Sequence, residues 1–295
     1  MKTDLLILWT WEYDADFLSI LQGACAKRNV TVQVVGPKEL PGFRDALLSG
    51  NIDARILIDR AWDWGGDYAR HTDAVRQKGL VLLNPYDLVR RAWNKPTMHY
   101  ELIAHGLNAP HMLVLPSFET QRLIMAPDLS PLGACFSVKG AHSGGSGVLP
   151  PLCSWQDVVA KRQEWPGDET IVQRWVEPQL MNKKRAWFRI FYACGATLPC
   201  WADDLTHIQA PVTPEEENLF QLHHLRGMTQ QIAGICQLNV FSTEIALDKQ
   251  HIWQVVDYVN EPCDYRLKSK AVNGVPDQVV QTVAERIVGW VARHI

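Results

Sequence analysis

A glycine- and serine-rich segment in the middle of the chain has the composition of a phosphate-binding loop. The strand expected at 134–138 leads into Lys139, and five small residues follow before an apolar strand begins at Val148: Ser143, Gly144, Gly145, Ser146 and Gly147. Glycines allow close backbone approach, so consecutive N–H groups can converge on phosphate oxygens while the lysine supplies a positive charge. The spacing differs from that of a P-loop. On these residues alone, a flexible hairpin loop is an equal alternative.

A second group of residues with possible chemistry lies toward the C-terminal end. Two neighbouring strands are expected at 240–247 and 252–258; they carry Glu244 and Asp257, and Asn260 follows. Oxygen ligands at the end of a β-hairpin can hold Mg²⁺ between the phosphates of a nucleotide. A single strand glutamate is more often solvated, so these residues by themselves only nominate a metal site.

The first 90 residues alternate short apolar runs with helical patterns, which is typical of βαβ units on a parallel sheet. Strands are expected at 4–9, 31–35, 53–58 and 80–83, and helices at 16–28, 38–49 and 67–77. Ligands of open α/β sheets bind beyond the carboxyl ends of the strands. Residues near those ends nominate a substrate site: Trp11, Glu12, Arg60, Trp62 and Asp63. The first strand is not followed by GxGxxG, which disfavours a dinucleotide-binding domain.

The pattern changes beyond residue 86. Two helices within 86–106 lead to a strand at 111–115, an amphipathic helix at 117–126, a strand at 134–138, a helix at 154–163 and a strand at 170–176. Further strands run through 188–201, a helix through 215–235, and a last helix through 277–293. No internal repeat or low-complexity linker separates these parts, so we expect them to form one working unit.

Composition and charge exclude several classes of protein. A chain of 295 residues with 47% hydrophobic residues can bury a substantial core, which rules out disorder. The net charge of -3 and the absence of any Lys/Arg run disfavour nucleic acid and anionic membranes as partners. The first apolar run is too short for a signal peptide or a membrane span. Seven cysteines without a CxxC pair favour reduced thiols in a cytoplasmic protein.

The order of the segments along the chain carries further information. Four stretches accompany the glycine-rich segment: WNKPTMHYELIAHGLNAPHMLVL at 93–115, IVQRWVEP at 171–178, RAWFRIFYACGATLPCWADD at 185–204 and NVFSTEIALDKQHIWQVVDYVNEPCDYR at 239–266. In this order they resemble the ATP-grasp superfamily of carboxylate ligases, especially its peptide-ligase-like (RimK-like) branch. The resemblance covers essentially the whole chain.

The resemblance implies a fold and a division of the chain. The expected fold is α/β and α+β, an ATP-grasp fold preceded by a parallel βαβ domain. The implied parts are an N-terminal βαβ domain at 1–90, a lid and small subdomain with the glycine-rich loop at 91–177, and a C-terminal subdomain with the metal-binding hairpin at 178–295.

The resemblance also assigns nucleotide-binding roles. Lys95 and Lys139 correspond to the two lysines that contact the ATP phosphates, and the loop 143–147 corresponds to a mobile lid over them. Without the resemblance, Lys95 would pass for an ordinary surface lysine. The adenine-binding strand corresponds to Gln173, Arg174, Trp175 and Val176, where the Trp175 carbonyl and the Val176 amide would contact the base.

Metal and catalytic roles follow in the same way. Glu244, Asp257 and Asn260 resemble the acidic, acidic, asparagine set that holds Mg²⁺, although many relatives place the second acid two residues before the asparagine, where this chain has Tyr258. Arg189 resembles a family arginine. The ribose-binding acid expected two residues earlier is replaced by Trp187, and Glu177 is a substitute. Arg266 is the candidate for a further catalytic arginine.

The activity implied is that of an ATP-dependent ligase. A substrate carboxylate would be phosphorylated to an acylphosphate, and an amine would displace the phosphate to form an amide, with ADP and phosphate as the other products. Small-molecule or peptide carboxylates and amines are the expected partners, and a homodimer is common among relatives. Two alternatives stay open: an ATP-grasp-fold kinase, and a nucleotide-binding protein without catalysis.

Overall fold

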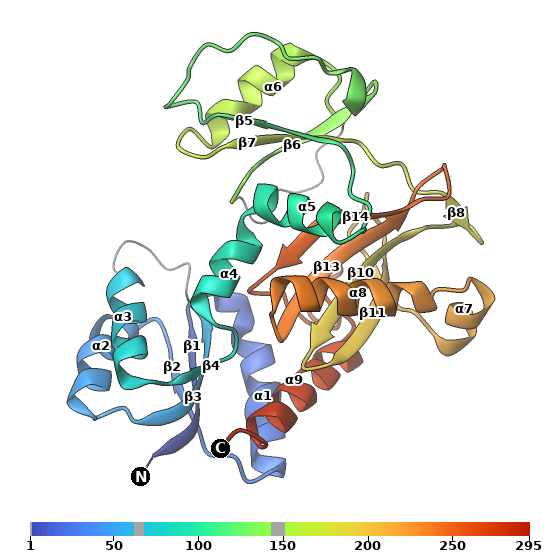
Figure 1. Ribbon diagram of the computed structural model, residues 1–295. Coiled ribbons are helices and arrows are strands. Elements are labelled where there is room, and N and C mark those ends of the chain that lie inside the picture. The colour runs from blue at the N-terminus through green and yellow to red at the C-terminus, as the bar shows by residue number, and fades with distance from the viewer. Residues whose placement is uncertain (1, 62–67, 143–150) are drawn as a thin grey trace.

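The computed structural model describes residues 2–61, 68–142 and 151–295 (Figure 1). Several residues nominated above lie outside these ranges: Trp62, Asp63, Ser143, Gly144, Gly145, Ser146 and Gly147. The described strands form a parallel N-terminal sheet, a small antiparallel sheet, a large antiparallel sheet and a two-stranded ribbon. The fold therefore combines the α/β and α+β character expected from the sequence.

The N-terminal sheet is built from strands in the order β2-β1-β3-β4. Its elements are β1 (Thr3–Trp9), α1 (Ala15–Lys27), β2 (Val32–Val35), α2 (Leu40–Ser49), β3 (Ala54–Arg60), α3 (Tyr68–Lys78) and β4 (Val81–Leu82), with a 3-10 turn at Glu12–Asp14. Successive side chains of a strand point to opposite faces. Leu6 and Leu8 accordingly share a core with Phe43 of α2, whereas Leu5 and Ile7 share one with Phe17 of α1.

The large sheet has the order β12-β11-β10-β13-β14, and every pairing in it is antiparallel. Its strands are β10 (Trp187–Ala193), β11 (Ala196–Ala202), β12 (Gln209–Pro211), β13 (Val240–Leu247) and β14 (Trp253–Asn260). Three helices cover one face: α4 (Tyr86–Trp93), α5 (Lys95–Ala104) and α8 (His223–Cys236) (Figure 1). The last helix, α9 (Asp277–Val291), lies against the other face and against α1.

The coverage of β10 explains where the large sheet is left open. Phe188 and Ile190 point into the core beneath α4, α5 and α8. On the opposite face, Phe191 and Ala193 pack in the core that includes α1 and α9. Trp187 and Arg189 lie on the same face, nearer the start of β10, and they line a cavity rather than pack in a core. The polar part of the face thus begins where the apolar cover from α9 ends.

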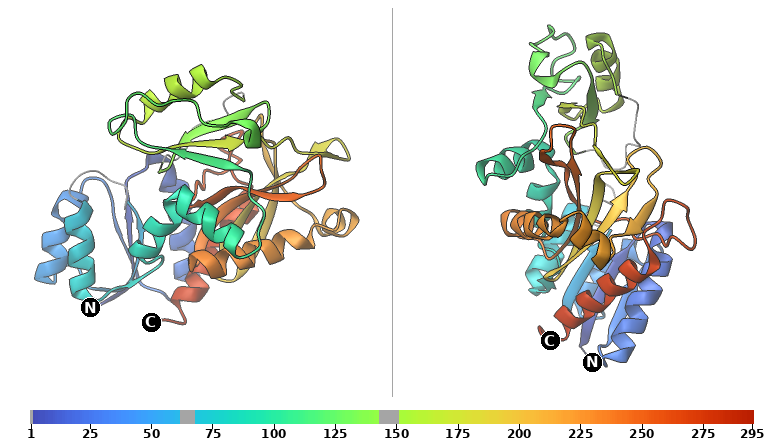
Figure 2. Two further views of the ribbon diagram at one scale, coloured as in Figure 1. Left: turned by 45° about the horizontal axis from the view of Figure 1, so that its top comes forward. Right: turned by 90° about the vertical axis from the view of Figure 1, so that its right-hand side faces the viewer.

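The small sheet has the order β5-β7-β6 and carries α6 on one side (Figure 2). Its elements are β5 (Met112–Leu115), β6 (Phe136–Gly140), α6 (Trp155–Lys161) and β7 (Thr170–Arg174), with 3-10 turns at Ser130–Leu132 and Arg162–Glu164. Its core is compact and separate, centred on Phe136, Val138 and Val172. The ribbon of β8 (Leu180–Met181) and β9 (Lys184–Arg185) follows the small sheet in the chain.

One pair of cysteines departs from the prediction of reduced thiols. Phe136 and Leu152 exchange backbone hydrogen bonds, so their neighbours Cys135 and Cys153 stand opposite each other in the next, closer pairing position. Their Cα atoms are 4.4 Å apart and the structure joins them by a disulfide. The other five cysteines are free thiols, as predicted.

Two helix predictions were wrong. The amphipathic helix expected at 117–126 is absent. The segment turns at Ser117 and Thr120, and the carbonyls of Pro116 and Gln121 accept hydrogen bonds from Arg162, which is fully buried. The helix expected at 215–235 is two helices, α7 (Pro214–Leu219) and α8, separated at Gln221 with its positive φ of 54°. Among the residues that the structure describes, no helix combines the length and apolar character needed to cross a membrane.

Candidate active site

A cavity of about 830 Å³ lies where the small sheet, the large sheet and the carboxyl ends of β1 and β3 meet. Most of the described residues nominated from the sequence line it: Trp11, Arg60, Lys95, Lys139, Gln173, Arg174, Trp175, Val176, Arg189, Glu244, Asp257, Asn260 and Arg266. Segments from Trp11 near the start of the chain to Arg266 near its end therefore contribute to one site. Glu12 does not line the cavity; it starts an exposed 3-10 turn whose far end, Asp14, points inward instead.

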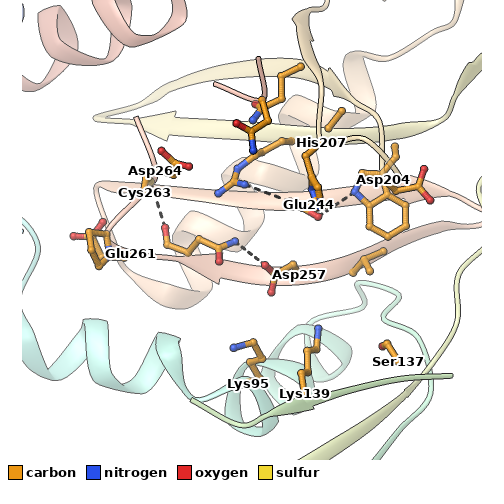
Figure 3. A pocket seen from close by; sticks show the side chains of 18 of the residues that line it. Lys95, Ser137, Lys139, Asp204, His207, Glu244, Asp257, Glu261, Cys263 and Asp264 are labelled. Atoms are coloured by element: carbon orange, nitrogen blue, oxygen red, sulfur yellow. Dashed lines mark hydrogen bonds and ion pairs between the residues drawn. The ribbon is translucent and has the colours of Figure 1, made fainter. Parts of the chain in front are cut away.

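Two lysines and two carboxylates stand on opposite sides of this cavity (Figure 3). Lys139 comes from β6 and Lys95 from the start of α5, where the Asn94 side chain caps the helix by accepting the Thr97 amide. Burial lowers the pKa of Lys95, partly offset by the charge of Asp257. Burial alone would raise the pKa of Asp257, but the charges of Lys139 and Lys95 hold it below its usual value. The two sides are therefore electrostatically matched.

The spacing of Asp257 and Asn260 is made possible by bulges in β14. Residues three apart on a regular strand face opposite sides of the sheet. Here Ser242 pairs with Asn260 and Glu244 with Asp257, so β14 carries one extra residue between the two pairings. Asp257 and Asn260 consequently share the cavity face, and the Asn260 amide donates to Asp257 Oδ2 at 2.9 Å.

Two side chains of β10 contact Glu244, one by a hydrogen bond and one as an ion pair. The indole Nε1 of Trp187 donates to Glu244 Oε2 at 3.0 Å, and Arg189 Nη1 lies 3.6 Å from Glu244 Oε1. Arg189 also donates to the Ser242 hydroxyl. Burial raises the pKa of Glu244, and the charge of Arg189 opposes that rise. The carboxylate is thus oriented before any ligand arrives.

Tyr258, the alternative metal-ligand position, faces away from the cavity. Its side chain is 1% exposed. The hydroxyl lies 2.7 Å from His99 Nδ1 and accepts the Gln173 amide at 2.8 Å. Tyr258 therefore joins α5, β7 and β14 behind the site, whereas Asp257 is the carboxylate that reaches the cavity.

The glutamate, aspartate and asparagine on the hairpin fit a magnesium ion by their chemistry. Mg²⁺ prefers oxygen ligands and is usually held by one or two carboxylates, with waters and phosphate oxygens completing its shell. The Glu244 and Asp257 carboxylates and the Asn260 amide oxygen form such a set at the cavity wall. In the part of the chain that the structure describes, no group of three or more His, Cys, Asp or Glu residues could hold a metal alone. Two carboxylates and one amide oxygen leave room for waters or phosphate oxygens in the shell of such an ion.

The segment after β7 offers backbone groups to the cavity. The Trp175 amide donates to the Cys135 carbonyl at 3.1 Å. Within the described residues, neither the Trp175 carbonyl nor the Val176 amide has a hydrogen-bond partner. Val138, Leu152 and Val256 form apolar wall nearby. A flat base with donor and acceptor edges suits this combination.

Two of the nominated side chains in this segment are already engaged. Gln173 is bound to Tyr258, and Arg174 lies 3.9 Å from Asp248. The backbone rather than these side chains is therefore presented to a ligand.

The end of the cavity near β1 and β3 differs from the prediction at Arg60. This guanidinium is 5% exposed and donates through Nε to Asp14 and through Nη2 to both Asp14 and the Cys263 carbonyl. It also lies 5.2 Å from the ring centres of Phe17 and Tyr265. Arg60 consequently connects the N-terminal sheet to the segment after β14. It lines the cavity, but its charge is already paired with Asp14.

Arg266 stands at the rim of the same end. It is bidentate with Asp264 and lies over the rings of Trp11 and Tyr13, with 5.7 Å to each ring centre. The interaction crosses from the N-terminal sheet to the loop after β14. Arg266 and Trp11 therefore lie together in the lining of this end of the cavity.

Sequence reasoning missed several residues of the lining. Asp14, Glu261 and Asp264 line the cavity, and so do Asp203, Asp204 and His207. Burial raises the pKa of Glu261 to about 8 against the charge of Arg60. The available signal was position, because Glu261 directly follows the nominated Asn260 and Asp264 comes three residues later.

Comparison with solved structures identifies the architecture. The ATP-grasp ligase PsnB with a minimal precursor, Mg and ADP matches at a TM-score of 0.63 and 13% identity, over 99% of each chain. D-alanine–D-alanine ligase from Bacillus anthracis with ATP gives 0.68 and 10%, over 98% of this chain and 96% of that one. A RimK domain ATP-grasp protein from Sphaerobacter thermophilus gives 0.67 and 14%, over 97% and 99%. The chain has the ATP-grasp fold.

The ATP-grasp likeness extends from the N-terminal sheet to α9, since it spans nearly all of each compared chain. No family model and no curated protein sequence matches this chain. The ATP-grasp fold is thus shared at identities of 10–14%, and the residues of the site must carry the argument for function.

Proposed function

We propose that this chain is an ATP-dependent carboxylate–amine ligase that forms ADP and phosphate. The observation that carries the proposal is the position of Lys95 and Lys139 opposite Glu244 and Asp257 across one cavity. That cavity is also lined by Trp175 and Val176, whose carbonyl and amide have no hydrogen-bond partner among the described residues, and it reaches the strand ends of the N-terminal sheet. A nucleotide needs such a base-binding edge, cations for its phosphates and oxygen ligands for its metal.

In the proposed reaction, an oxygen of the substrate carboxylate attacks the γ-phosphorus of ATP. The bond from that phosphorus to the ADP oxygen breaks, and an acylphosphate forms. An amine nitrogen then attacks the acyl carbon, phosphate leaves, and the nitrogen loses a proton as the amide forms. Catalysis of such transfers consists mainly of positioning and charge stabilisation.

The chain's own residues supply those two effects. Lys95 and Lys139 would neutralise phosphate oxygens from the small-sheet side, and Arg189, which lies beside Glu244, would stabilise charge on the transferred group. Glu244, Asp257 and Asn260 would hold Mg²⁺, which supplies Lewis-acid polarisation of the phosphates. Arg266 at the rim would meet the carboxylate, with Trp11 packed against it.

A peptide carboxylate is one candidate substrate. PsnB has been solved with a precursor peptide and AMPPNP, so this architecture accommodates a peptide in a related ligase. Small-molecule carboxylates fit the proposal equally well. The division at 1–90, 91–177 and 178–295, a homodimer, a cytoplasmic location and the lack of nucleic-acid or membrane partners stay predictions from the sequence.

The decisive experiment is a screen of carboxylates and amines coupled to ADP release, with mass spectrometry of the product. A ligase yields an amide and needs the amine for full turnover. ADP formation that is independent of any amine, with a stable phosphorylated product, would show a kinase instead.

Nucleotide binding can be tested separately by isothermal titration with ATP and Mg²⁺. We expect Lys139→Ala to weaken binding by about 10-fold or more, because a charge-assisted contact to phosphate contributes roughly 1.5–3 kcal/mol. Lys27→Ala, on the exposed side of α1, is the matched control. An unchanged affinity in Lys139→Ala would argue against the proposed site.

A further inference from the structure

We infer that Trp187 is a positioning residue for Glu244, and that its neutral N–H orients this metal ligand without reducing its charge. The inference rests on the proposed function, because it requires Glu244 to hold a metal ion. It concerns a residue that stands where the sequence resemblance led us to expect a ribose-binding acid.

The register of the large sheet places the donor and the acceptor together. Arg189 pairs directly with Glu244, and Trp187, two residues earlier on β10, pairs with Ala246. Trp187 and Arg189 therefore share a face of β10, and both side chains lie next to Glu244 on the cavity side. The two side chains contact different carboxylate oxygens. Trp187 Nε1 donates a hydrogen bond to Oε2 at 3.0 Å, and Arg189 Nη1 lies 3.6 Å from Oε1.

The two donors have different chemical consequences. A guanidinium so close to a carboxylate neutralises part of its charge and competes with a metal ion. An indole N–H is a donor without formal charge, so it restricts the rotation of the carboxylate and leaves its charge available. Outer hydrogen bonds of this kind fix the orientation of metal-binding groups. Trp187 therefore performs the orienting task that a second arginine would perform only at the expense of metal affinity.

The position of Asp257 adds to the need for orientation. Glu244 and Asp257 are directly opposed on neighbouring strands, so their like charges repel each other. A Glu244 side chain without a donor on Oε2 would rotate to lengthen that separation. The bond from Trp187 keeps both carboxylates on the cavity wall.

The first test measures metal binding by titrating Mn²⁺, followed by electron paramagnetic resonance, in the presence of ADP. We expect Trp187→Phe, which keeps a ring and removes the N–H, to weaken Mn²⁺ binding by about 10-fold. Trp253→Phe is the matched control, because Trp253 lies on β14 in contact with Phe188 and outside this cavity lining. Wild-type affinity in Trp187→Phe would overturn the inference.

A double-mutant cycle separates positioning from packing. If Trp187 acts through Glu244, the substitution Trp187→Phe should cause no further loss in a Glu244→Gln background. An equal loss in both backgrounds would assign Trp187 a packing role and reject the inference. If wild-type protein shows no ADP-dependent Mn²⁺ site, the proposed function fails as well, so the two failures are distinguishable.

Discussion

Glu244 and Asp257 face each other as a directly opposed pair between β13 and β14, and β14 carries one extra residue on each side of that pair. Two like charges in this position destabilise a sheet unless cations stand nearby. Arg189, Lys95 and Lys139 provide those cations. The hairpin therefore keeps a paired acidic site that a ligand cation can enter, at a point where the strand pairing is irregular.

The choice between Asp257 and Tyr258 as metal ligand can be decided by substitution. We expect Asp257→Asn to weaken ADP-dependent Mn²⁺ binding by about 10-fold or more, because it removes a charged oxygen ligand. Tyr258→Phe should leave Mn²⁺ affinity within about 2-fold and instead lower the free energy of unfolding by about 1–2 kcal/mol, since His99 and Gln173 lose their partner. Mn²⁺ titration and urea unfolding measure the two effects. The reverse pattern would assign the metal to Tyr258.

Stability should depend on pH through His99. Burial, together with the charges of His111 and Lys139, lowers the pKa of His99 to about 4 from its usual 6.5. Between pH 6.5 and pH 4, His99 is protonated in the unfolded chain but neutral in the folded chain. The contribution of neutral, buried His99 to stability is therefore fully present above pH 6.5 and is lost as the pH falls to 4. We expect wild type to lose about 3 kcal/mol more than His99→Gln between pH 7.5 and pH 4. Urea unfolding of both proteins at a series of pH values measures this difference. If the free energy of unfolding changed with pH equally in wild type and His99→Gln, the prediction would be wrong.

Reduction of the Cys135–Cys153 disulfide should destabilise the protein. A cross-link between residues 18 apart restricts the unfolded chain, which corresponds to about 3 kcal/mol. Dithiothreitol should lower the free energy of unfolding of wild type by about that amount. The double variant Cys135→Ser/Cys153→Ser should not respond to the reductant. A wild-type stability that is insensitive to reduction would mean that the bond is absent in solution.

Two glycines should respond in opposite directions to alanine. A Cβ on Gly274 would lie 2.5 Å from the Leu267 carbonyl oxygen, in the loop that carries Arg266 and Asn273 to the cavity. We expect Gly274→Ala to cost about 1–3 kcal/mol. Gly234 in α8 has no atom within 4 Å of the added Cβ, so Gly234→Ala should stabilise by about 0.5–1 kcal/mol. Thermal unfolding measures both, and equal effects would refute the steric argument.

The strands of the sheets were largely predictable because their signal is local. The apolar run expected at 240–247 is β13 to the residue, and the run at 4–9 lies within β1. The failed helix at 117–126 shows the limit, because the carbonyls of Pro116 and Gln121 accept hydrogen bonds from Arg162, which lies more than 40 residues away. No window of sequence contains that partner.

In the site, too, local sequence signals were predictable and those that depend on a distant partner were not. Lys139, Glu244 and Asn260 were recognisable from the order of motifs, and all three line the cavity. The spacing of Asp257 from Asn260 looked irregular because a bulge is a property of two paired strands, not of one. The bond from Arg60 to Asp14 was not predictable, because Asp14 lies 46 residues away in the chain.

Helix α9 supplies a large share of the core beneath the N-terminal sheet. Val280, Val283 and Ile287 pack in the same cluster as Leu5 and Phe17. A ribosome releases the N-terminal strands first, but α9 is translated almost 200 residues after β4. At ordinary elongation rates of about 5–20 residues per second, that interval is roughly 10–40 seconds. During this time the residues of α1 and β1 that later pack against α9 lack that partner, so the core of the part of the protein that is made first is completed last.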